Sequence, residues 1–108
     1  MSESDSMFAM SNLLPNRTGL KYPIWYSAGI GDQKPGIKVD LKDGRSIWVS
    51  ILDKIVTGDD DSISPDDLND TFRWIDMNKE LLLKYWDGAQ KGIIDSVDVS
   101  EQILKLNN

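Results

Sequence analysis

The sequence predicts an α+β fold in which a small antiparallel sheet of three or four strands packs against one long helix and a short C-terminal helix. Two patterns predict this class. A helical pattern covers residues 64–88, and an alternating pattern with a tight turn covers residues 37–51. Neither pattern recurs, and 108 residues are the size of one domain. We expect a disordered N-terminus over residues 1–12 and a single domain over residues 13–108.

The N-terminal half begins with a turn and a strand. Residues 13–19 place Pro15 and Gly19 around polar residues, which is typical of a turn. Residues 23–27 are rich in aromatic and β-branched side chains and predict the first strand. The following residues, 28–36, hold three Gly and one Pro, so we expect a loop there.

Residues 37–51 predict a β-hairpin. Apolar and polar residues alternate in both arms, so each arm has one apolar face. Asp43 and Gly44 between the arms favour a type I′ turn. This hairpin places Trp48 on the face opposite the Ile and Val side chains. Residues 53–57 are either a further short strand or a continuation of the second arm past a bulge.

Residues 64–88 predict one amphipathic helix. Ser64 is the expected N-cap, Pro65 takes the first helical position and Gly88 follows the end. Apolar side chains recur at steps of three, four and seven, and this stripe must pack on the sheet. The stripe comprises Leu68, Phe72, Ile75, Leu82 and Trp86, and Met77, Leu81 and Leu83 widen its second half. Residues 100–106 then indicate a short C-terminal helix or edge segment.

The composition excludes several chemistries. Cys and His are both absent, so the chain has no disulfide, no thiolate nucleophile, no His-based catalytic triad and no ordinary zinc site. We therefore expect a protein that is not an enzyme and that holds no cofactor or metal. No apolar run of eighteen residues indicates a membrane span, and we expect a cytoplasmic location.

Charge is distributed unevenly along the chain. Residues 1–50 carry six basic and five acidic side chains, whereas residues 51–108 carry six basic and thirteen acidic ones. Duplex nucleic acid is not an expected partner, because phosphate binding requires clustered Lys and Arg. Asp59, Asp60 and Asp61 begin a run of six Asp without a basic residue. This run is either a solvated linker or a surface that imitates the charge of nucleic acid.

The aromatic residues indicate a recognition surface. Four Trp in 108 residues exceed what a core of this size needs, although Trp86 is expected in the core. Trp48, together with Trp25 or Tyr26 beside the Gly-rich loop, favours a surface that binds a partner or stacks on a base. The basic residues of this surface are Lys34, Lys38 and Arg45, and a nucleotide site would add Arg17 and Lys21. The alternative is that a second helix or a partner subunit covers this face.

Residues 72–82, FRWIDMNKELL, followed by Tyr85, Trp86 and a Gly, resemble the closing helix of the small bacterial proteins grouped as domain of unknown function 4160. Residues 35–39, PGIKV, are similar to a strand entry in one branch of that family. Many members carry a Pro-His-x-His segment, and this chain has no His, so no function of those imidazoles carries over. The family lacks an established activity, and its members are often regarded as parts of toxin–antitoxin or phage-defence gene pairs. The resemblance implies a small protein that acts by binding.

Three hypotheses about function follow from these patterns. The first is a non-enzymatic interaction or regulatory protein that binds another macromolecule, foremost a protein, in a toxin–antitoxin, phage-defence or anti-defence setting. The second is a nucleotide or small-anion binding protein that uses the aromatic and basic face. The third is an acidic nucleic-acid mimic that inhibits a DNA- or RNA-binding protein. A homodimer would be a further way to cover Trp48.

Overall fold

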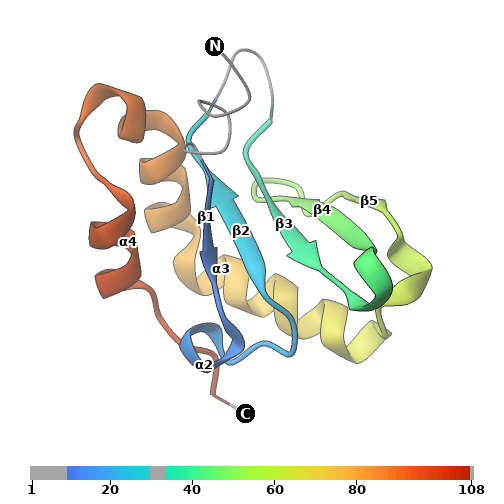
Figure 1. The fold of residues 1–108 in the computed structure, drawn as a ribbon. Helices are drawn as coiled ribbons and strands as arrows, with labels where there is room; N and C mark the ends of the chain where they lie inside the picture. The colour runs from blue at the N-terminus through green and yellow to red at the C-terminus, as the bar shows by residue number, and fades with distance from the viewer. Residues whose placement is uncertain (1–9, 30–33, 108) are drawn as a thin grey trace.

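A five-stranded antiparallel sheet backed by a long helix makes up the fold in the computed structural model, which describes residues 10–29 and 34–107 (Figure 1). The predicted α+β class is confirmed, and the predicted count of three or four strands is wrong. The strands lie side by side in chain order as β1 (Met10–Leu13), β2 (Ile24–Ser27), β3 (Gly36–Asp40), β4 (Ser46–Ser50) and β5 (Val56–Gly58).

β1 is the strand that the sequence pattern does not reveal. Residues 10–12 belong to the segment expected to be disordered, and they pair with β2 from Met10↔Ser27 to Leu13↔Ile24. Four residues carry too short a pattern to recognise, so the pairing with β2 defines this strand. The rest of that segment, residues 1–9, lies outside the described residues, as do residues 30–33 of the predicted loop.

Three α-helices lie within the described ranges: α2 (Pro15–Thr18), α3 (Pro65–Gly88) and α4 (Ser96–Gln102). Short 3-10 turns join the elements as η1 (Lys42–Gly44), η2 (Asp60–Ser62) and η3 (Ala89–Lys91). α3 runs diagonally behind the sheet, and α4 lies beside β1 (Figure 1). The turn predicted over residues 13–19 is the single helical turn of α2, which ends at Gly19 with a φ of 81°.

The first turns of α3 and α4 both follow local capping signals. The Ser64 hydroxyl accepts a hydrogen bond from the Asp67 N–H at 3.1 Å, and Pro65 opens α3 as predicted. The short C-terminal helix is confirmed, but it begins at Ser96 rather than near residue 100. Asp95 and Asp98 cap it reciprocally, each carboxylate accepting from the other residue's N–H, at 2.9 and 3.2 Å.

The hairpin has the predicted turn. Asp43 and Gly44 have φ values of 61° and 74°, as the two central residues of a type I′ turn require. The Arg45 N–H donates to the Lys42 carbonyl at 3.2 Å and closes it. Of the two alternatives for residues 53–57, the structure has the further short strand, because the chain turns after β4 and returns as β5.

The core lies between the sheet and α3. One face of the three central strands is fully buried there, through Ile24, Ile37, Val39, Ile47 and Val49. Burial of side chains of this size stabilises the fold by about 1.5 to 3 kcal/mol each, which makes this layer the largest favourable contribution to folding.

The buried face of α3 differs in part from the predicted stripe. Ile75, Leu82 and Trp86 are buried as predicted, and Leu68 and Phe72 are half-buried. The prediction for Met77 is wrong, because its side chain is 41% exposed. The stripe is instead completed by four residues that the pattern did not mark, namely Thr71, Trp74, Asn78 and Tyr85, which are all at most 5% exposed.

The chain after α4, residues 103–107, crosses α3 and reaches α2; we call it the C-terminal strap. The Leu106 N–H donates to the Thr18 carbonyl at 2.7 Å. A Cβ atom at Gly19 would lie 2.1 Å from the Leu106 carbonyl oxygen, so only glycine allows this close approach. The strap thereby fastens the C-terminal end of the described chain to its first helix.

Candidate binding face

A row of five side chains crosses the sheet on the face away from α3. Strand register pairs Asn12 with Trp25, Trp25 with Lys38, Lys38 with Trp48, and Trp48 with Thr57. Residues directly opposite each other share a face, so these five form one line, which we call the open-face row. Of the described helices, none lies over this face (Figure 1).

Asp40 orders the central part of the open-face row. The Trp25 Nε1–H donates to Asp40 Oδ2 at 2.6 Å, and the Lys38 Nζ lies 3.5 Å from Asp40 Oδ1. The indole of Trp25 is therefore held in one orientation, and the charge of Lys38 is compensated on the sheet itself. Asp40 is two residues after Lys38 in β3, so strand alternation alone identifies its face, although the sequence patterns did not single it out.

Trp48 is packed from one side by Trp86 at the end of α3. Their ring centroids are 6.4 Å apart with an angle of 59° between the planes. The space for the two indoles depends on glycines: a Cβ atom at Gly36 would lie 2.4 Å from the Trp48 ring, and one at Gly29 would lie 2.4 Å from Trp86 Nε1. The burial of Trp86 is thus confirmed, but it belongs to this pair rather than to the main core.

Of the two aromatic residues offered for β2, Trp25 faces outward and Tyr26 does not. Tyr26 is 3% exposed, and its ring meets that of Tyr85 edge-on at a centroid distance of 5.1 Å. Its hydroxyl donates to the Ser96 carbonyl at 3.3 Å. Burial raises the pKa of Tyr26 above its ordinary value, so the phenol stays neutral. Tyr26 is a core residue that links β2 to α4.

The five basic residues proposed for a nucleotide site do not converge. Arg17 donates to both the hydroxyl and the carbonyl of Ser100, and so fastens α2 to α4. The Lys21 Nζ lies 3.7 Å from Asp67 Oδ2 at the start of α3. Of the five, only Lys38 belongs to the open-face row.

The other two basic residues are engaged near the hairpin. The Lys34 Nζ lies 3.4 Å from Asp53 Oδ2, and Arg45 donates to the Ser62 hydroxyl at 3.0 Å. The pKa of Asp53 is lowered, first by the hydrogen bond from the Ser50 hydroxyl and then by Lys34. These contacts tie loops to one another rather than presenting cations to a common ligand.

The acidic run is partly structural. Asp59 Oδ2 accepts from the Ser46 N–H at 3.1 Å, and so holds the connector against β4. Asp60 and Asp61 lie in η2 with exposed side chains. No group of three carboxylates gathers to hold a metal ion in the residues that the structure describes.

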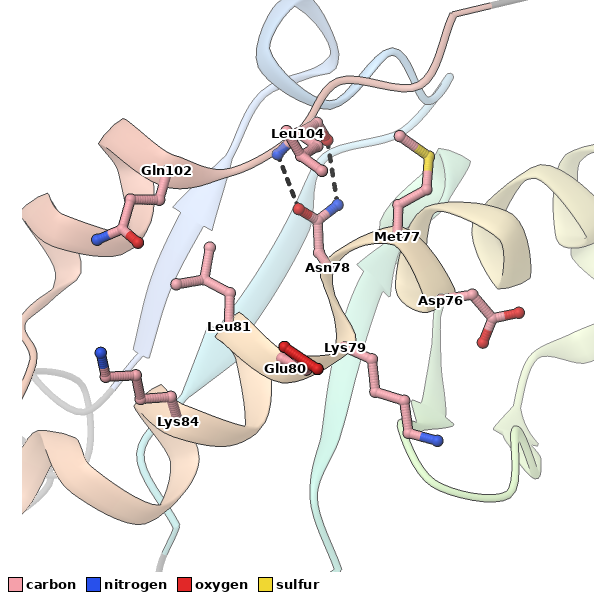
Figure 2. Close-up of a pocket in the computed structure, with 9 residues that line it drawn as sticks. All are labelled: Asp76, Met77, Asn78, Lys79, Glu80, Leu81, Lys84, Gln102 and Leu104. Carbon is pink, nitrogen blue, oxygen red and sulfur yellow. Dashed lines mark hydrogen bonds between the residues drawn. The ribbon is translucent and has the colours of Figure 1, made fainter.

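A groove of about 590 Å³ lies between α3 and the C-terminal strap (Figure 2). Figure 2 shows the Asn78 amide directed at the backbone of Leu104, to which it donates at 3.1 Å and from which it accepts at 2.7 Å. The charged side chains that line the groove alternate in sign along α3, namely Asp76, Lys79, Glu80 and Lys84. This lining favours no single class of ligand, and we regard the groove as a consequence of how the strap is held.

Within residues 10–29 and 34–107, no helix has the length and apolar character needed to cross a membrane. Comparison of the chain with models of protein families, with curated proteins and with solved structures finds no match.

Proposed function

We propose that this protein is a non-enzymatic binding module that uses the open-face row to bind another protein. The observation that carries the proposal is the placement of Trp25 and Trp48 on either side of Lys38, on a sheet face that the described helices leave uncovered. Trp contributes more binding energy per residue than most side chains, because it buries a large area with little loss of conformational freedom.

The electrostatics of the face favour a protein over a phosphate-bearing ligand. Asp40 lies 3.5 Å from the Lys38 Nζ, so the row presents little net positive charge. The other four candidate cations are engaged on different elements, and the whole chain has a net charge of −6. A nucleotide would have to compete with these partners and would meet an unfavourable long-range field.

A binding role also fits the chemistry that the face can offer. Its side chains are an amide, two indoles, an ammonium group and a hydroxyl, without a thiol or imidazole that could act as nucleophile or general base near neutral pH. The resemblance to the domain of unknown function 4160 adds a setting, a toxin–antitoxin or phage-defence pair in the cytoplasm. We therefore expect the partner to be the product of a neighbouring gene.

Affinity capture from the native cell tests this proposal. Two variants change the row, Lys38→Glu and Trp25→Ser, and Lys42→Glu makes the same charge change in the exposed turn η1. We expect one stoichiometric protein partner with the wild type and with Lys42→Glu, and its loss with both row variants. Circular dichroism checks that each variant is folded.

Two results would contradict the proposal. One is a partner that every variant retains equally, which would place the binding surface elsewhere. The other is quenching of Trp fluorescence by a panel of nucleotides that is lost in Lys38→Glu, which would favour the nucleotide function instead.

A further inference from the structure

A second groove, of about 440 Å³, lies between the edge strand β1 and the helix α4. It adjoins the open-face row, because Trp25 belongs to both. Its lining comes from β1, β2 and α4 and comprises Ser11, Asn12, Trp25, Tyr26, Ser96, Val97, Ser100 and Glu101. Val97 is 61% exposed and gives the groove an apolar contact.

The hydrogen-bond ladder shows which backbone groups of β1 face away from the sheet. The Asp40 N–H donates to the Pro23 carbonyl at 3.0 Å. In an antiparallel ladder, every second residue pair exchanges backbone hydrogen bonds. Trp25 is two residues after Pro23, so its backbone groups bond to those of Lys38 in β3. Tyr26 then directs its backbone groups to β1, where its partner is Ser11.

It follows that Ser11 and Leu13 bond to β2, and that Asn12 between them directs its N–H and carbonyl outward. Among the residues that the structure describes, none hydrogen-bonds to these two groups of Asn12. Outward backbone groups of this kind on an edge strand can pair with an added strand. The outward groups of Asn12 lie at the groove that Val97 and Ser100 line from the other side.

The described lining of the groove carries one charged side chain, Glu101 of α4. Arg17 contacts α4 from α2, and its guanidinium is bound to Ser100. A carboxylate as the one charged group of the described lining favours a ligand that carries positive charge beside Glu101.

We propose that this groove binds an extended polypeptide segment containing Lys or Arg, which pairs with β1 as an added strand. This mode of binding takes its affinity from backbone hydrogen bonds and its specificity from alternate side chains. One set of alternate side chains would meet Trp25, and the other would meet Val97 and Ser100. The inference rests on the proposed function, since it names the part of the partner that binds.

Selection of peptides tests the inference directly. A display library of random dodecamers is panned against the full chain, the enriched peptides are synthesised with a fluorescent label, and their Kd is measured by anisotropy. We expect peptides in which Lys or Arg alternates with apolar residues. Two copies of each peptide carry N-methyl groups on one or the other set of alternate amides. The copy whose methylated amides face β1 should not bind, because only one set of alternate amides in a strand points at a given neighbour.

One position offers a matched pair of variants. Asn12→Pro removes the outward N–H while Ser11 and Leu13 keep their bonds to β2, and proline is tolerated in edge strands. Asn12→Ala keeps that N–H. We expect Asn12→Pro to bind about tenfold or more weakly than Asn12→Ala, because both variants lose the amide side chain and only the proline removes the outward donor and clashes with the incoming strand. Glu101→Lys should weaken binding of basic peptides by about tenfold.

The inference is overturned if no peptide is enriched, or if Asn12→Pro binds the peptides as well as the wild type does and both N-methylated copies bind as well as the unmodified peptide. A wild type that sediments as a dimer and an Asn12→Pro variant that sediments as a monomer would also overturn it, since a second copy would then occupy the edge. Retention of the cellular partner by Asn12→Pro, with its loss in Lys38→Glu, would remove this inference alone. Peptide binding without any partner that depends on Lys38 would remove the proposed function.

Discussion

Asn78 illustrates how a single polar residue can decide the packing of a helix. It is 3% exposed, it lies on the buried face of α3, and its amide satisfies both backbone groups of Leu104, 26 residues away. A third bond runs from its Nδ2 to the Trp74 carbonyl at 3.0 Å. The Asn78 amide therefore pairs with the backbone N–H and carbonyl of the C-terminal strap, as the backbone of a neighbouring strand would.

Replacing Asn78 by Ala should destabilise the protein by about 2 to 3 kcal/mol, because it leaves the Leu104 N–H and carbonyl without partners near the core. Urea unfolding of Asn78→Ala and of Glu80→Ala measures this effect. The exposed Glu80 serves as the control and should change stability by less than about 0.5 kcal/mol. Equal effects of the two substitutions would show that the strap does not depend on Asn78.

Asp53 should make stability depend on pH in the acid range. Its pKa is lowered from 3.8 in the folded state, mainly by the Ser50 hydroxyl. A carboxyl group whose pKa is lowered on folding stabilises the protein above its unfolded pKa, and this contribution is lost as the pH falls through the folded value. We expect the Tm difference between wild type and Asp53→Asn to be largest near pH 6 and to shrink below about pH 4. A difference that is constant from pH 3 to 7 would rule this out.

At the scale of elements, the pair of Trp48 and Trp86 joins the end of α3 to the open-face row. Gly36 makes this pair possible, because a Cβ atom there would lie 2.4 to 2.5 Å from three atoms of the Trp48 ring. We expect Gly36→Ala to destabilise the protein by about 1 to 3 kcal/mol and to weaken the near-ultraviolet circular dichroism of the Trp pair.

A double-mutant cycle provides the control for this prediction. In a Trp48→Val background the clash is removed, so Gly36→Ala should cost clearly less than in the wild type. Additive free energies of unfolding would mean that the glycine is needed for another reason.

The elements whose signals are local could be predicted, and those that depend on distant partners could not. The turn at Asp43 and Gly44 and the first turn of α3 follow from adjacent residues, and both have the predicted geometry. β1 exists because β2 is beside it, and Asn78 is buried because Leu104 returns to it. Neither partner can be recognised from the local pattern.

The same distinction applies to the candidate site. Alternation in the hairpin places Trp48 on the outer face, but the choice between Trp25 and Tyr26 requires the register between β2 and β3. The contacts of Arg17 with Ser100 and of Arg45 with Ser62 join residues 83 and 17 positions apart. Charge counted along the sequence therefore overestimates how many cations a ligand would meet.

At the scale of the whole molecule, the fold is a two-layer arrangement with one face of the sheet used for packing and the other exposed. α3 is continuous from Pro65 to Gly88, so the layer behind the sheet is a single rigid element. α4 lies on the β1 side, and the groove between β1 and α4 adjoins the open-face row, because Trp25 belongs to both. We infer that binding occurs on these neighbouring surfaces, with little change in the backbone of the sheet.

The indole N–H signals of the four Trp residues in a nitrogen–proton correlation spectrum, followed while the captured partner is added, test this account most directly. We expect the signals of Trp25 and Trp48 to shift, whereas that of Trp74, which is 0% exposed behind the sheet, stays in place. Shifts confined to Trp74 and to backbone amides on the outer surface of α3, with Trp25 and Trp48 unchanged, would contradict it.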